Sequence, residues 1–99
     1  MKECVAKWLN EQFCGDQEMM AAVYDEYKDT LARLLNDLAA ARQSGDATAI
    51  DRALHTIKGS AAMVGDTEPS TLAAESRKLT DPAALEAVEQ KLRAFAAAL

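Results

Sequence analysis

The chain is poor in the residues that build disulfide frameworks, sheets and metal centres. Its 99 residues include two cysteines, two prolines, four glycines and one histidine, and aromatic residues make up 5%. On a helix rising 1.5 Å per residue, Cys4 and Cys14 would lie about 15 Å apart, beyond disulfide reach unless the chain turns between them. Two cysteines without a framework predict reduced thiols. One histidine without clustered ligands gives no support to a metal site.

Long apolar runs and an excess of positive charge are also missing. No stretch approaches the ~18 apolar residues that cross a bilayer. Residues 1–13 carry scattered charges in place of the continuous apolar segment of a signal peptide. The net charge is −5, whereas a nucleic-acid partner would require a basic surface for its phosphates. The sequence therefore predicts a soluble cytoplasmic protein that neither inserts into a membrane nor binds nucleic acid.

What the sequence does have is helical character. Hydrophobic residues make up 49% of the chain, and many of them are alanine, which favours closely packed helices over a sheet sandwich. No segment alternates with the period of a strand, and there is no internal repeat or low-complexity linker. A chain of this length forms one compact domain, which we place at residues 1–99.

Apolar residues three and four positions apart divide the chain into five helical segments. Gly15-Asp16, Ser44-Gly45-Asp46 and Asp81-Pro82 mark their boundaries, because glycine ends helices while aspartate and proline begin them. The fold expected is all-α: an antiparallel up-down-up-down four-helix bundle with a short additional N-terminal helix. The helices are expected at about 2–13, 17–44, 47–65, 69–79 and 82–98. Leu72 and Leu79 should be the main apolar contacts of the fourth.

Trp8 and Phe13 are the large aromatic residues of the first segment. We interpret them as covering one end of the bundle. The alternative is that Trp8 lies partly exposed and contributes to a docking surface.

The stretch Ile50–Gly65, IDRALHTIKGSAAMVG, holds the only histidine. At about 100° per residue, its larger apolar residues fall on a stripe roughly 80° wide, which predicts the buried face. His55 lies roughly 140° from the centre of that stripe and is expected to be exposed. The stripe consists of Ile50, Leu54, Ile57, Ala61 and Val64, and the residues expected beside His55 are Asp51, Lys58, Gly59, Ala62 and Asp66.

Gly59 is unusual because a glycine inside a helix costs about 1 kcal/mol relative to alanine. It projects away from the apolar stripe, so an internal neighbour is not the expected reason for it. We interpret Gly59 as leaving room for a partner that approaches His55. Lys58, three residues after the histidine, can extend its ammonium toward an anionic group carried on the imidazole.

Taken singly, these residues have plainer interpretations. An exposed histidine or lysine is ordinarily a solvated side chain. Ser60 and Ala61 lean toward the buried side and permit close helix packing. Gly65 is expected to be a helix C-terminal glycine in a left-handed conformation. It is their combination around His55 that favours a functional site.

The run His55-Thr56-Ile57-Lys58-Gly59-Ser60-Ala61, with Gly65 ten residues after the histidine, resembles the histidine phosphotransfer (HPt) domain of two-component phosphorelays. The resemblance extends from about Phe13 to the end of the chain. Phe13-Cys14-Gly15-Asp16, the long helix and Ser44-Gly45-Asp46 follow the layout of such domains. Asp66-Thr67-Glu68-Pro69 departs from it, because the family usually continues with apolar residues soon after the second glycine.

The resemblance implies a role for each residue at the site. Nε2 of His55 would take a phosphoryl group from the phospho-aspartate of a response regulator receiver domain, and a second receiver would later remove it. Phosphoryl transfer needs positioning and charge neutralisation, and Lys58 would offset the charge. Gly59 and Ala62 would admit the receiver's active site. The docking surface is expected to include these two residues and the early turns of the long helix, together with Asp51, Arg52 and Asp66.

The same resemblance fixes the expected cofactors and partners. The chain should bind no cofactor or metal, because the receiver brings the Mg²⁺ and the aspartate. No G-x-x-x-x-G-K-[ST] or G-x-G-x-x-G motif is present, so we expect a phosphocarrier without kinase activity of its own. Its partners would be receiver domains, a hybrid sensor histidine kinase, or both. The resemblance and the lack of an unassigned apolar stripe predict a monomer.

Two other functions stay open at this point. One is the phosphoacceptor domain of a chemotaxis-type histidine kinase, which shares H-x-x-K-G but receives its phosphoryl group from an ATP-binding domain. A kinase domain elsewhere on the same polypeptide would favour it. The other is a helical bundle that binds receivers without turnover. Retained receiver binding after His55→Ala, with no phosphoryl group ever detected on the wild type, would support it.

Overall fold

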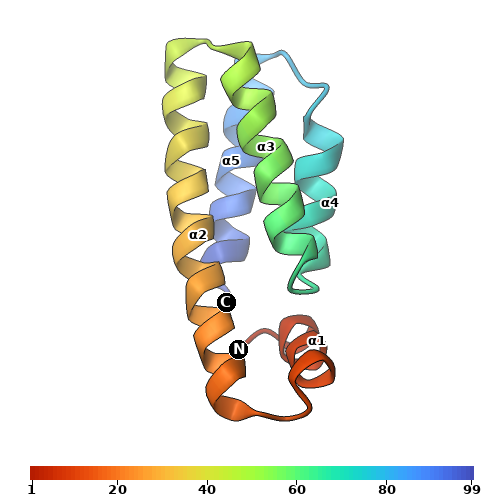
Figure 1. The fold of residues 1–99 in the computed structure, drawn as a ribbon. Helices are drawn as coiled ribbons and strands as arrows, with labels where there is room; N and C mark the ends of the chain where they lie inside the picture. The colour runs from red at the N-terminus through yellow and green to blue at the C-terminus, as the bar shows by residue number, and fades with distance from the viewer.

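Five α-helices and no strands make up the protein in a computed structural model that describes all 99 residues. Helix α2 packs against α3 and α5, and α4 packs against the same two helices, so that α2 to α5 close a ring (Figure 1). Successive helices of this ring run in opposite directions. The all-α antiparallel bundle that the sequence predicts is confirmed. The helices are α1 (Glu3–Phe13), α2 (Gln17–Ser44), α3 (Ala47–Ala62), α4 (Thr67–Ser76) and α5 (Pro82–Ala97).

Local capping explains where three of the helices begin. The carboxylates of Asp16, Asp46 and Asp81 each accept a hydrogen bond from the backbone N–H three residues on, at 3.2, 3.1 and 3.2 Å. Such caps satisfy a backbone donor that has no partner inside the helix. Gly45 ends α2 with a φ of 69°, and Pro82 is the first residue of α5. These signals are local, and α1, α2 and α5 begin and end within one residue of the expected positions.

The junction between α3 and α4 differs from the sequence expectation. Helix α3 ends at Ala62 and not near residue 65, because Gly65 turns the chain with a φ of 73° and the backbone N–H of Asp66 bonds to the carbonyl of Ala61 at 2.9 Å. Helix α4 then begins at Thr67, since a proline such as Pro69 is tolerated within the first helical turn. It ends at Ser76, three residues early.

The ranking of Leu79 as a main apolar contact of α4 is wrong. The residue lies beyond the end of the helix and is 38% exposed.

The core lies along the axis of the bundle. The apolar stripe of α3 faces it: Leu54, Ile57 and Ala61 are fully buried, Val64 is nearly so, and Ile50 is half-buried. The whole opposite face of α3 is therefore turned outward. The molecule measures 43 × 20 × 19 Å, and no helix is long and apolar enough to cross a membrane. Helix α2 contributes Met20, Tyr24, Tyr27, Leu31, Leu34, Leu35 and Leu38 to the core, and α5 contributes Leu85, Val88 and Leu92.

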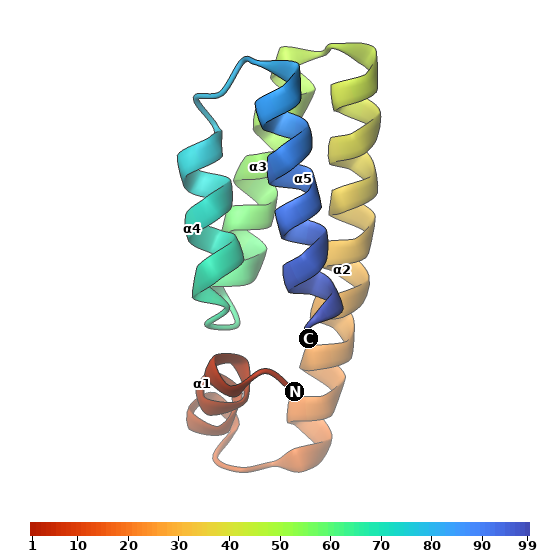
Figure 2. The ribbon, with the colours of Figure 1, turned by 180° about the vertical axis from the view of Figure 1, so that it is seen from behind.

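Helix α1 lies across the end of the bundle where α3 turns into α4, beside the first turns of α2 (Figures 1 and 2). Trp8 and Phe13 pack against the core from this position, so their expected role in covering one end of the bundle is confirmed. A Cβ atom added to Gly65 would lie 2.7 Å from Cβ of Trp8. Glycine is therefore needed at position 65 both for its backbone conformation and for the close approach of α1.

A buried polar network also ties α1 to the turn after α3. The side chain of Asp66 is fully buried; Lys2 donates to its Oδ1 at 2.7 Å and the Tyr27 hydroxyl donates to its Oδ2 at 2.6 Å. Burial and the hydrogen bond to Asp66 raise the pKa of Tyr27. Burial alone would lower the pKa of Lys2, but the bond to Asp66 raises it overall. The network joins the N-terminus, α2 and the α3–α4 turn.

Candidate functional site

His55 lies on the outward face of α3, as the helical periodicity predicts. His55, Gly59 and Ala62 are exposed, while Asp51 and Lys58 are half-buried. Residues four positions apart on a helix stand one turn apart on the same face. Asp51, His55 and Gly59 therefore form one row along this face, with the histidine in the middle.

The space beside the histidine is open at Gly59. No atom lies within 4 Å of the position that a Cβ on Gly59 would occupy. Internal packing thus gives no reason for a glycine here. The interpretation of Gly59 as room for an external partner is consistent with this space, although the structure holds no partner.

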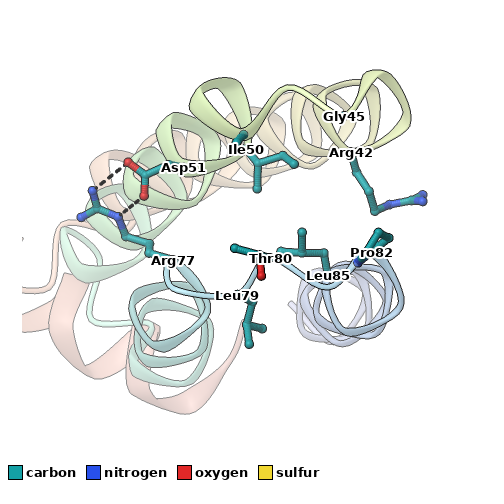
Figure 3. A pocket seen from close by; sticks show the side chains of 10 residues that line it. Arg42, Gly45, Ile50, Asp51, Arg77, Leu79, Thr80, Pro82 and Leu85 are labelled. Atoms are coloured by element: carbon teal, nitrogen blue, oxygen red, sulfur yellow. Dashed lines mark hydrogen bonds and ion pairs between the residues drawn. The ribbon is translucent and has the colours of Figure 1, made fainter.

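Arg77 is the residue of the site that the sequence analysis missed. It follows the last turn of α4, and its Nη1 lies 3.0 Å from Nδ1 of His55. Its Nε and Nη2 donate to Oδ1 and Oδ2 of Asp51 at 2.9 and 3.1 Å, the two dashed lines of Figure 3. Such fork-shaped pairs fix the guanidinium in plane and direction. A guanidinium has no acceptor atom, so Nδ1 of His55 accepts, and the ring proton of the neutral imidazole lies on Nε2.

The ion pair changes the acidity of both partners. The hydrogen bond from Arg77 holds the pKa of Asp51 below its usual value, and the same bond raises the pKa of Arg77. Asp51 therefore stays ionised over a wider pH range than a free carboxylate. The Asp51–Arg77 ion pair holds in place the guanidinium that contacts the imidazole.

Helix packing brings these three side chains together. Because α4 runs antiparallel to α3 (Figure 1), Arg77 at the end of α4 lies beside Asp51 and His55 of α3. At the other end of α4, the Ser70 hydroxyl donates to the carbonyl of Lys58 at 3.0 Å. This bond fixes how α3 and α4 lie against each other at a point within one helical turn of His55.

One of the expected docking residues is buried, and another is already paired with Arg77. Asp66 is buried and bonded to Lys2 and Tyr27, so it is wrong as a docking residue. Helical periodicity would place Asp66 beside His55 only if α3 continued past Ala62, where it ends. Asp51 stands beside His55 as expected, but both of its oxygens are taken up by Arg77.

The remaining predicted residues differ in their exposure and in their bonds. Arg52 is exposed, and its carbonyl accepts from the Thr56 hydroxyl at 2.9 Å. Lys58 forms no ion pair, as the full set of ion pairs shows. Ala61 is fully buried and Ser60 half-buried, which agrees with a packing role for both.

Several hollows lie beside α3, and two of them are near its ends. One, of about 250 Å³, lies between α2 and the end of α3 and is bordered by Met63, which is 71% exposed. The other, of about 300 Å³, lies near the α2–α3 and α4–α5 connections, with the Asp51–Arg77 pair in its wall (Figure 3). Neither contains a group of three or more metal-ligating side chains, and the rest of the chain has none. The hollow between α2 and the end of α3 is lined by Val23, Glu26, Tyr27, Thr30, Ser60, Met63 and Val64.

Comparison with known families decides what this arrangement is. The model of the Hpt domain family matches residues 22–99, from the second turn of α2 to the end of the chain. The chain belongs to the Hpt domain family. Hpt domains are phosphocarriers in two-component signalling and exchange phosphoryl groups with receiver domains and kinases. Helix α1 lies outside the match. No curated protein and no solved structure matched the chain.

Proposed function

We propose that this Hpt domain relays a phosphoryl group between the aspartates of response regulator receiver domains through a phosphohistidine on Nε2 of His55. The observation that carries the proposal is the position of the chain's only histidine. It is exposed in the middle of the outward face of α3, with open space at Gly59 and a guanidinium in contact with its ring. A buried or fully ligated histidine could not meet a second protein's active site.

The transfer needs little covalent chemistry from the domain itself. Nε2 attacks the phosphorus of the phospho-aspartate, a bond from nitrogen to phosphorus forms, and the electron pair of the broken bond from phosphorus to oxygen returns to the aspartate. The charge of the moving group is reduced by a nearby cation, here Lys58. The receiver supplies the Mg²⁺ and the aspartate. Transfer to a second receiver reverses these steps.

The receiver would dock over the second half of α3 and the neighbouring turns of α2. Gly59, Ala62 and Met63 are exposed along this path, and the hollow beside Met63 is lined by residues of both α2 and α3. Methionine adapts its shape to different apolar partners, which suits a domain with both a donor and an acceptor. Exposed Arg52, on the other side of His55, offers a positive charge to the partner.

The proposal includes a monomer that works in the cytoplasm. Large apolar side chains are exposed only at Met1, Met19, Met63 and Leu79. Single exposed apolar residues are normal for a monomer, whereas a stable dimer needs a contiguous patch.

Replacing Gly59 by glutamine is expected to slow phosphoryl transfer from a phosphorylated receiver by tenfold or more while leaving the fold intact. Because the space at this position is open, the new side chain projects into solvent, and removing a helical glycine should raise stability by up to about 1 kcal/mol. Transfer rates under single-turnover conditions and urea denaturation check the two expectations.

The matched control is Ala87→Gln, an exposed position on α5, a helix that packs against α2 and α4. It should transfer at the wild-type rate. Equal transfer by Gly59→Gln and the wild type would mean that the receiver does not approach this side of His55.

The relay itself is tested with two receivers. Labelled phosphoryl is placed on a donor receiver, and its appearance on an acceptor receiver is followed with and without a small amount of this domain. We expect label on the acceptor only when the domain is present, and none when the acceptor's aspartate is replaced by asparagine. Label that reaches the domain but leaves for no receiver would contradict the relay. A domain that takes no label from any receiver but takes it from the ATP-binding domain of a kinase would favour the phosphoacceptor domain of a kinase.

A further inference from the structure

The contact between Arg77 and His55 has a consequence for the bound phosphoryl group. Arg77 occupies Nδ1 of the imidazole at 3.0 Å, while Asp51 holds the guanidinium through two bonds of 2.9 and 3.1 Å. A phosphoryl group on Nε2 takes the place of the proton on that nitrogen and leaves the lone pair of Nδ1 free to accept. The contact seen in the unphosphorylated protein therefore fits the phosphorylated ring equally well.

We propose that Arg77, held by Asp51, is a positioning residue that occupies Nδ1 of His55 and thereby slows the loss of a phosphoryl group from Nε2. This inference rests on the proposed function and deepens it. A carrier must keep its phosphoryl group until it meets the acceptor, and the Asp51–Arg77 pair supplies that persistence. It acts through the ring nitrogen that faces away from the phosphoryl group.

The chemistry of hydrolysis explains the effect. Water attacks the phosphorus, the bond from phosphorus to nitrogen breaks, and its electron pair goes to Nε2. If Nδ1 carries a proton, the ring leaves as neutral imidazole. If Nδ1 carries none, the ring must leave as an anion or take a proton at Nε2 in the same step, which is slower. Because Arg77 donates to the lone pair of Nδ1, that lone pair is not available to take up the proton.

Arg77 is the charged side chain in contact with the ring, but it is not the only charge nearby. On α3 itself, Asp51, Arg52 and Lys58 lie within about one turn of His55. From α2, Asp37 lines a hollow together with Arg52. Only Arg77 bonds to the imidazole. Removing it should therefore change the behaviour of Nδ1 far more than removing a more distant charge.

The test measures how long the phosphoryl group stays on the domain alone. Phosphoramidate, a small donor that phosphorylates histidine directly, is used to load the wild type, Arg77→Ala, Asp51→Asn and the control Arg33→Ala. Because the chain has one histidine, loss of its phosphorus NMR signal reports on His55. A hydrogen bond of this kind predicts loss about three- to tenfold faster for Arg77→Ala. We expect a smaller acceleration for Asp51→Asn and none for Arg33→Ala, an exposed arginine of α2.

Nitrogen NMR of the unphosphorylated ring gives a second readout that a purely structural role would not move. The wild type should show Nδ1 as a hydrogen-bonded acceptor with the proton on Nε2, and Arg77→Ala should lose the hydrogen-bonded signature. Loss of phosphoryl at the wild-type rate or slower in Arg77→Ala, or a proton on Nδ1 in the neutral wild-type ring, would overturn the inference. Neither arm uses a receiver, so failure of the relay would be seen separately.

Discussion

Replacing Asp66 by alanine is expected to lower the free energy of unfolding by about 3 kcal/mol. The carboxylate is fully buried and bonds to both Lys2 and Tyr27. Removing one partner of a buried ion pair costs about 3–5 kcal/mol. The lower figure applies because Lys2 is 17% exposed and can turn to water, while the Tyr27 hydroxyl loses its acceptor in the interior.

Urea denaturation at neutral pH measures this loss of stability, because the hydrogen bonds among Lys2, Tyr27 and Asp66 are all formed at that pH. The raised pKa of Tyr27 means that its contribution to stability is fully present below the ordinary tyrosine value of 10.0 and is lost as the pH rises above it. The matched control is Asp25→Ala. Asp25 pairs with Lys28 at 3.5 Å, but its side chain is 70% exposed, and such pairs contribute about 0–1 kcal/mol.

A double-mutant cycle separates the network from other effects of the substitution. Lys2→Met should also destabilise, because it leaves the Asp66 carboxylate buried with Tyr27 as its one side-chain partner. The two substitutions together should cost clearly less than their sum, since they remove the same interaction. Independent effects of Lys2→Met and Asp66→Ala, or a loss in Asp66→Ala no larger than in Asp25→Ala, would contradict this description of the α3–α4 turn.

The parts of the fold that the sequence predicted are those fixed by neighbouring residues. Asp16, Asp46 and Asp81 cap helices through hydrogen bonds to the backbone N–H three residues further along the chain. The buried stripe of α3 follows from the helical repeat alone. The exposure of His55 on the opposite face follows from the same repeat. Each of these signals lies within one or two helical turns of the feature it predicts.

The parts that the sequence did not predict depend on contacts between distant residues. Arg77 reaches His55 across 22 positions, and Lys2 reaches Asp66 across 64. A basic residue near a helix end has many ordinary roles, so the composition of α4 gave no signal for Arg77. Asp66 was misplaced because a helical repeat says nothing about where the helix stops, which Gly65 and the approach of Trp8 decide.

Replacing His55 by glutamine is expected to abolish phosphoryl acceptance and leave the fold unchanged. The side chain is exposed, and its one hydrogen bond is the one from Arg77. The amide oxygen of glutamine can accept the same bond, and exposed substitutions of this kind change stability by less than about 0.5 kcal/mol. An amide nitrogen has no free lone pair comparable to that of imidazole, so it is not a nucleophile. Loss of function in this variant would thus report on chemistry and not on folding.

The most direct test of the account is transfer of labelled phosphoryl from a phosphorylated receiver domain to the wild type and to His55→Gln. We expect label on the wild type that is lost in acid and retained in base, as for a phosphohistidine, and no label on the variant. A wild type that binds several receivers yet stays unlabelled, or a His55→Gln variant that is labelled as well as the wild type, would show that His55 carries no phosphoryl group.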